Sequence, residues 1–149
     1  PTLNLPLAHG TSAGLAFDAG LLARSIELRL DPRIVDGLAR GEGFLCGMLL
    51  RRGIASDVGI VRTTSQGISA DLREAFLRGL GAGWADGAER ASPPAEVEIP
   101  AAQRPPFWTG FAARLLEVDA SGARRRASEI TADLPAADRE LLERALSRP

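Results

Sequence analysis

The amino-acid sequence predicts a mainly α-helical fold of about six helices, with one or two short strands as an open addition. Three observations lead to this prediction. Apolar residues recur three and four positions apart over long segments, as they do on one face of an amphipathic helix. Proline and glycine divide these segments where helices would begin and end. A motif of Phe, two variable residues, Gly and a large apolar residue recurs at intervals of roughly 30 residues, which indicates related helical units.

The repeated motif accounts for nearly all Phe residues of the chain. It begins at Phe17, Phe44, Phe76 and Phe107, and its glycines are Gly20, Gly47, Gly79 and Gly110. Residues three apart share a helix face, so each bare Gly lets a neighbouring backbone approach beside the ring. A Gly in a helix interior costs about 1 kcal/mol relative to Ala, and we therefore predict that these four structural glycines lie at close helix crossings. Glycines four apart would form a groove, and such pairs include Gly43 and Gly47, Gly79 and Gly83, and Gly83 and Gly87.

The N-terminal part of the chain contains two predicted helices. Residues Thr2–Leu7 alternate weakly between apolar and polar and allow a short strand. A helix is predicted from Ser12 to about Leu30, and it stops before Pro32 because a proline disfavours helical backbone in the preceding residue. A second helix follows over about Asp31–Arg52. One of its faces carries Ile34, Leu38, Leu45 and Leu49.

The middle of the chain contains the clearest helical pattern. Residues 57–67 are polar and contain Gly, although Val58 and Ile60 allow a brief strand. From Ser69 to about Ala88 we predict a helix that Ser69 caps. Its apolar stripe comprises Leu72, Phe76, Leu80 and Gly83.

The C-terminal part predicts three shorter helices. Two adjacent prolines open a helix over about residues 105–118. Gly122 separates it from a short basic helix that holds the run Arg124–Arg126. Pro135 begins the last helix, whose buried stripe we expect to comprise Leu141, Leu142, Ala145 and Leu146.

Composition indicates one globular domain over residues 1–149 and excludes several classes of function. The chain is 45% hydrophobic and 25% charged, which is close to the globular average. A net charge of −1 gives no excess of positive charge for nucleic acid or an anionic membrane. One Cys and one His form neither a disulfide nor a common zinc site. Because the sequence shows neither a basic leader nor a long apolar segment, we expect a cytoplasmic protein. We also expect no metal and no cofactor.

Five aromatic residues are the candidate binding residues. Aromatic side chains at helical spacing usually fill a core, but they are also the natural walls of a pocket for an apolar ligand. The five are Phe44, Phe76, Trp84, Phe107 and Trp108.

Few residues suggest catalysis, and we assign no catalytic residue. The run from Gly79 to Gly83 lies inside a predicted helix, so it is interpreted as a packing surface and not as a phosphate loop. The candidate acid–base groups are His9, Asp71, Glu74 and Asp86. Carboxylates three apart on a helix are more often a solvated face, and the basic run at 124–126 is followed closely by acidic residues.

Three segments carry a resemblance to a known family. Ala75–Trp84 reads AFLRGLGAGW and Phe107–Ala113 reads FWTGFAA. They are similar to paired motifs of an uncharacterised bacterial family associated with enediyne polyketide biosynthesis genes, and Gly41–Gly47 is similar to its preceding glycine and aromatic segment. The resemblance covers about Gly37–Gly122 and departs from the family at Gly83, where an Arg is common. Because members are about twice as long, it implies a half-length relative or a part of a longer protein.

These observations favour a non-catalytic helical accessory or scaffold protein. We expect it to bind an apolar small molecule, a partner protein or a second copy of itself, and the resemblance implies a setting in bacterial secondary metabolism. The alternative is a small enzyme that acts on a polyketide-like intermediate through the four acid–base groups above.

Overall fold

The computed structural model describes residues 29–52, 69–88 and 99–147 of the chain. These residues form five α-helices and one short 3₁₀ helix, with no strand among them, so the prediction of a mainly α-helical fold is confirmed. The predicted strands near 2–7 and 58–60 lie outside the described residues. So do Gly20 and all but the last two residues of the predicted helix at 12–30.

Helix α2 (Pro32–Arg51) begins where the sequence predicts it. The Asp31 carboxylate accepts a hydrogen bond of 2.8 Å from the Arg33 backbone N–H, which satisfies one of the donors left unpaired at a helix start. Pro32 fits the first position because an N–H there would have no acceptor within the helix. The local sequence therefore fixes this helix start without help from the rest of the fold.

Helix α4 (Ala70–Ala85) starts where the sequence predicts it and ends earlier than predicted. Ser69 stands at the N-cap position, but its hydroxyl makes no capping hydrogen bond. The exposed Asp71 lies in the first turn, where its charge favours the positive end of the helix dipole. The helix ends earlier than the predicted limit near Ala88, because Gly87 adopts a φ of +70°, a left-handed conformation that glycine reaches readily.

The C-terminal part contains three further helices, as predicted. The 3₁₀ helix η1 (Ala101–Gln103) runs directly into α5 (Arg104–Val118), which has prolines in its first turn. Helix α6 (Ala123–Ile130) follows Gly122. Helix α7 (Ala136–Leu146) follows Pro135 at its N-cap position.

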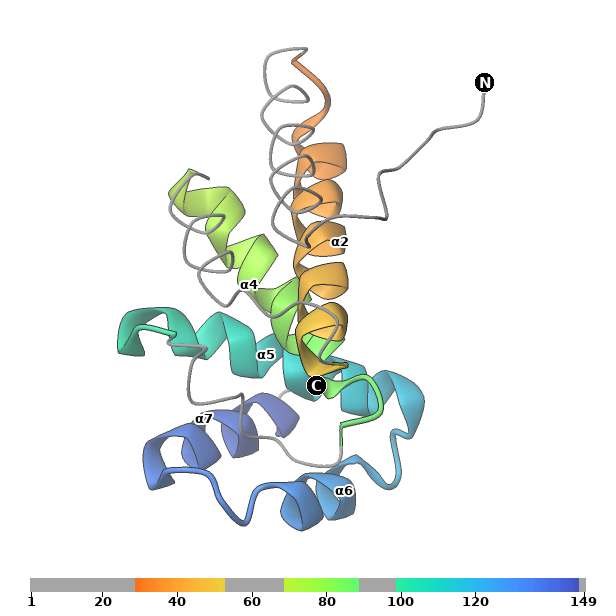
Figure 1. Cartoon of the computed structure of the whole chain (residues 1–149), viewed down its shortest axis with the longest axis vertical. Coiled ribbons are helices and arrows are strands. Elements are labelled where there is room, and N and C mark those ends of the chain that lie inside the picture. The colour runs from red at the N-terminus through yellow and green to blue at the C-terminus, as the bar shows by residue number, and fades with distance from the viewer. Residues whose placement is uncertain (1–28, 53–68, 89–98, 148–149) are drawn as a thin grey trace.

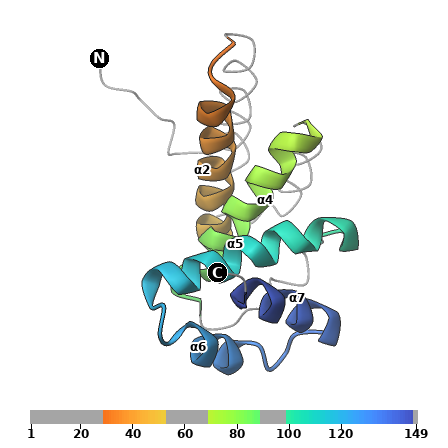
Figure 2. The same ribbon diagram turned by 180° about the vertical axis from the view of Figure 1, so that it is seen from behind.

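Helix α5 lies in the middle of the molecule and contacts α4, α6 and α7. Figures 1 and 2 both show α2 and α4 crossing at one end, α5 running across beneath them, and α6 and α7 at the other end. Helix α4 contacts α2 and α5, and α5 in turn contacts α7 and α6. The largest fully buried side chains come from four of these helices and are Phe76, Phe107, Phe111, Leu80, Leu142 and Cys46.

Helix α2 is apolar on two faces, and the face with small residues is the one that packs closely. Its buried residues are Val35, Ala39, Gly43, Cys46, Gly47 and Leu50. On the face of large aliphatic residues, Ile34 is 54% exposed and Leu45 is 39% exposed. Leu38 and Leu49 on that face are partly buried against the core. Small side chains thus decide which side of α2 meets α4.

Candidate functional site

Helices α2 and α4 meet backbone to backbone through four glycines, two on each helix. A Cβ at Gly43 would overlap the Phe76 carbonyl oxygen and lie 2.8 Å from the Leu80 backbone nitrogen. A Cβ at Gly47 would overlap the Leu80 carbonyl oxygen. Real Cβ atoms do not come this close to backbone atoms in close-packed interiors. The α2 side of this crossing therefore has room for glycine only.

The α4 side of the same crossing repeats the arrangement. A Cβ at Gly79 would overlap the Arg40 carbonyl oxygen and lie 2.9 Å from the Phe44 backbone nitrogen. A Cβ at Gly83 would overlap the Phe44 carbonyl oxygen. The two pairs of glycines spaced by four thus face each other, which is the geometry of small-residue helix contacts.

A second crossing joins α4 to α5 in the same way. A Cβ at Gly81 would overlap the Phe107 carbonyl oxygen and lie 3.0 Å from the Phe111 backbone nitrogen. A Cβ at Gly110 would lie 2.6 Å from the Arg78 carbonyl carbon. Gly81 projects from the side of α4 opposite to the α2 contact, because residues two apart differ by about 200° around a helix. Helix α4 is therefore held closely on two sides.

The Phe residue of each described motif presents its carbonyl oxygen to a glycine on the neighbouring helix. Phe44 faces Gly83, Phe76 faces Gly43, and Phe107 faces Gly81. The glycine hydrogen occupies the position that a Cβ would take, which is the arrangement of weak Cα–H···O contacts at helix interfaces. In the recurring motif, both the backbone carbonyl and the ring of the Phe residue therefore take part in helix packing.

The motif glycines Gly47, Gly79 and Gly110 all lie at these crossings, whereas Gly20 is outside the described residues. Gly87 instead lies near the Arg51 guanidinium and ends α4. The contact made by Gly81 was missed in the sequence, although its position between two other glycines carried the signal.

The candidate wall residues lie mainly in the core. Phe76, Phe107, Trp108 and Trp84 are buried, and Phe44 is half-buried. The Phe107 and Trp108 rings meet edge to face with centroids 4.9 Å apart, a favourable aromatic geometry. None of the five lines either of the two cavities described below.

The buried Asp138 joins α5 to α7 and was missed in the sequence. One of its carboxylate oxygens accepts a hydrogen bond of 3.1 Å from the Trp108 indole N–H, and the other forms an ion pair of 3.4 Å with Arg104. A buried charge is tolerated only when it is paired and hydrogen-bonded, and these two donors meet that need. By contrast, the buried indole N–H of Trp84 has no hydrogen-bond acceptor among the described residues.

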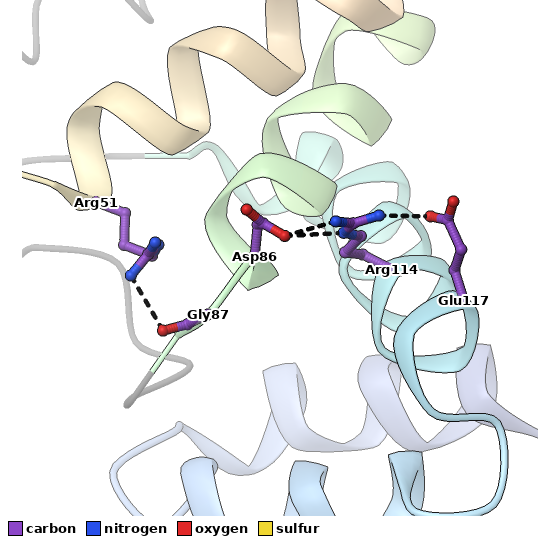
Figure 3. A network of polar contacts seen from close by, with 5 residues as sticks. All are labelled: Arg51, Asp86, Gly87, Arg114 and Glu117. Atoms are coloured by element: carbon purple, nitrogen blue, oxygen red, sulfur yellow. Dashed lines mark hydrogen bonds and ion pairs between the residues drawn. The ribbon is translucent and has the colours of Figure 1, made fainter.

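A polar network ties the end of α4 to α5 and α2 (Figure 3). The Arg114 guanidinium donates two hydrogen bonds, of 2.7 and 3.1 Å, to one oxygen of Asp86 and a third, of 3.0 Å, to Glu117. These hydrogen bonds, first that to Asp86, raise the pKa of Arg114 above its ordinary value. Beside them, Arg51 donates to the Gly87 carbonyl oxygen at 3.1 Å. These hydrogen bonds hold the end of α4 against α5 and α2.

Arg114 also lies over the half-buried ring of Phe44, with its guanidinium carbon 5.7 Å from the ring centroid. This distance permits a cation–π interaction. The Phe44 ring of α2 thereby contacts the same arginine that joins α5 to the end of α4.

The structure does not bring the three described acid–base candidates, Asp71, Glu74 and Asp86, together at one site. Asp86 is bound by Arg114, and Glu74 forms an exposed ion pair with Arg78 one helical turn later. Asp71 is exposed, and His9 lies outside the described residues. None of the three described carboxylates lines either of the two cavities.

Two cavities open near α6, and they divide the basic run between them. The first, of about 590 Å³, lies between α6 and α7 and includes Arg124. The second, of about 430 Å³, lies among the ends of α4 and α5 and the start of α6, and includes Arg125 and Arg126. Arg126 is engaged there, since it donates to the Ala88 carbonyl oxygen at 2.7 Å and pairs with Glu129. The run is therefore not a single basic patch.

No family profile, curated protein or solved structure matches the chain. Within the described ranges, no three His, Cys, Asp or Glu residues are grouped so that they could hold a metal ion. The same ranges contain no helix with the length and apolar character needed to cross a membrane.

Proposed function

We propose that this chain is a non-catalytic helical accessory or scaffold protein that binds a small apolar molecule or a partner protein. The observation that carries the proposal is the glycine-mediated packing of α2, α4 and α5, which brings three helices into backbone contact. Such packing leaves little freedom for the helices to slide, and a rigid support is what a binding surface requires. The open cavities lie at the other end of α5, on helices that this support positions.

The carboxylates support a structural role. Asp86 and Glu74 are each held by an arginine, and Asp138 fastens α7 to α5. An enzyme acting on a polyketide-like intermediate would need acid–base groups placed within hydrogen-bond reach of a bound substrate. The aromatic residues predicted to line a ligand pocket lie mainly in the core and stabilise the fold. We therefore assign the ligand to the two open cavities near α6. The secondary-metabolic setting belongs to this proposal through the sequence resemblance alone, and a cytoplasmic location is proposed with it.

Native mass spectrometry of the freshly purified chain tests the proposal. The expected result is a folded species that retains an apolar small molecule, or that forms a defined complex with a second copy or with a partner protein. A bare monomer that binds neither apolar metabolites nor protein partners would refute the binding function. Turnover of a polyketide-like thioester that is lost in Asp71→Asn or Glu74→Gln would favour the enzyme instead.

A further inference from the structure

The cavity between α6 and α7 is amphipathic, with a buried apolar floor and a charged rim. Its floor includes Ala127, Leu142 and Leu146, which are at most 7% exposed. Its rim includes the exposed side chains of Arg124 and Arg139. A cavity of about 590 Å³ is within the usual range for small-molecule sites. This cavity is called the α6–α7 groove below.

The two arginines of the α6–α7 groove differ from most arginines around them. Among the described arginines of α5, α6 and α7, four form ion pairs with a carboxylate: Arg104, Arg114, Arg126 and Arg144. Arg124 and Arg139, like Arg125 at the second cavity, form no ion pair in the described part of the chain, and Arg139 donates there only to the Leu134 carbonyl oxygen, at 3.2 Å. Both arginines therefore bring positive charge to the groove, and no carboxylate of residues 29–52, 69–88 or 99–147 balances it through a direct contact.

One carboxylate shares the groove and limits the charge of its ligand. Glu143 also lines it, so the three charged side chains sum to one net positive charge. This balance suits a ligand with a single negative charge and disfavours a phosphate dianion, which the Glu143 carboxylate would repel. Guanidinium groups match a carboxylate well, because they can donate two parallel hydrogen bonds to its two oxygens.

We propose that the α6–α7 groove binds a monoanionic amphiphile, a carboxylate carrying a short apolar chain. The carboxylate lies between Arg124 and Arg139, and the chain covers Leu142 and Leu146 at the floor. This inference rests on the proposed binding function and names the class of ligand and its site.

Titration calorimetry of the full chain with octanoate tests the inference. Octanoate should bind saturably, while octanol, which lacks the charge, and acetate, which lacks the chain, bind at least about tenfold more weakly. Removal of two methylenes, from octanoate to hexanoate, should weaken binding by up to about 15-fold, which corresponds to roughly 0.8 kcal/mol for each fully buried methylene. Inorganic phosphate should bind more weakly than octanoate.

Charge variants assign the site. Arg124→Gln and Arg139→Gln should each weaken octanoate binding about five- to tenfold, because each removes one charge-assisted contact from an exposed position without disturbing the core. Arg144→Gln is the matched control, because Arg144 lies on the same helix as Arg139 but pairs with Glu140 outside the groove. It should leave the affinity unchanged. Circular dichroism verifies that all three variants fold.

Several results would overturn the inference. These are equal binding of octanol and octanoate, tighter binding of phosphate than of octanoate, or equal losses in Arg144→Gln and Arg139→Gln. Absence of octanoate binding, when native mass spectrometry still detects another ligand or partner, would overturn this site and leave the proposed function in place. Absence of both would overturn the proposed function as well.

Discussion

Replacing Gly43 with alanine should destabilise the protein, although the same change at Gly41, two residues earlier in α2, should stabilise it. Both glycines lie in the interior of one helix. A Cβ at Gly41 meets no atom within 4 Å, whereas a Cβ at Gly43 meets the backbone of α4 at Phe76 and Leu80. The pair therefore separates the intrinsic effect of glycine from the effect of the helix crossing.

The magnitude follows from two opposing contributions. Alanine is favoured over glycine in a helix interior by about 1 kcal/mol, and this gain applies at both positions. At Gly43 the new methyl group overlaps a carbonyl oxygen and lies 2.8 Å from a backbone nitrogen, neither of which can rotate away. Overpacking of this kind costs about 1–3 kcal/mol, and a lost Cα–H···O contact adds about 0.5–1 kcal/mol. Gly43→Ala should thus lower the free energy of unfolding by about 0.5–3 kcal/mol, and Gly41→Ala should raise it by up to about 1 kcal/mol.

Urea unfolding followed by circular dichroism measures both changes. The transition midpoints should move in opposite directions, with similar slopes if the unfolded states are alike. If Gly43→Ala proves as stable as Gly41→Ala, the two helices do not meet at backbone distance and the argument from the glycine spacing is wrong.

Three further predictions concern polar groups. Asp86→Asn should lower the free energy of unfolding by roughly 1–2 kcal/mol in the same urea assay, because it removes the charge that holds Arg114 in a partly buried site. Trp108→Phe should cost about 1–3 kcal/mol, since the buried Asp138 loses its indole donor, and a loss no larger than that of an exposed substitution would contradict this role. The backbone N–H of Gly122, and then the Ser121 hydroxyl, lower the pKa of Asp119, so its contribution to stability is present above its unfolded pKa and is lost as the pH falls through its lower folded pKa. Asp119→Asn should therefore flatten the acid limb of a stability-versus-pH curve, and an unchanged limb would exclude this contribution.

The helix starts could be predicted from the sequence because their causes are local. Asp31 and Pro32 act on the backbone beside them, and the same holds for the prolines that open α5 and α7. The end of α4 was harder, because Gly87 stops the helix earlier than the apolar pattern does. Ser69 has the residue type of a cap without the hydrogen bond, which shows that residue preference and geometry are separate conditions.

Which helix faces pack together depends on how the helices are placed in three dimensions, and the sequence predicts this only in part. Spacing alone identified the glycine grooves of α2 and α4, but it did not show that Gly81 serves α5. The pairing of Trp108 with Asp138 joins residues 30 positions apart and has no local signal. The basic run was visible, whereas its division between two cavities follows from how α6 packs.

The three glycines of α4 also bear on how the chain folds. Gly79, Gly81 and Gly83 lie within a helix of 16 residues, and together they lower its intrinsic stability by about 3 kcal/mol relative to alanine. An isolated peptide of that length is marginally helical even with favourable residues, so α4 alone should be largely unfolded. The residues that weaken the free helix are the ones that let α2 and α5 approach it. Helix formation in α4 is thereby coupled to docking on both sides, and the three helices gain their structure together in one cooperative step.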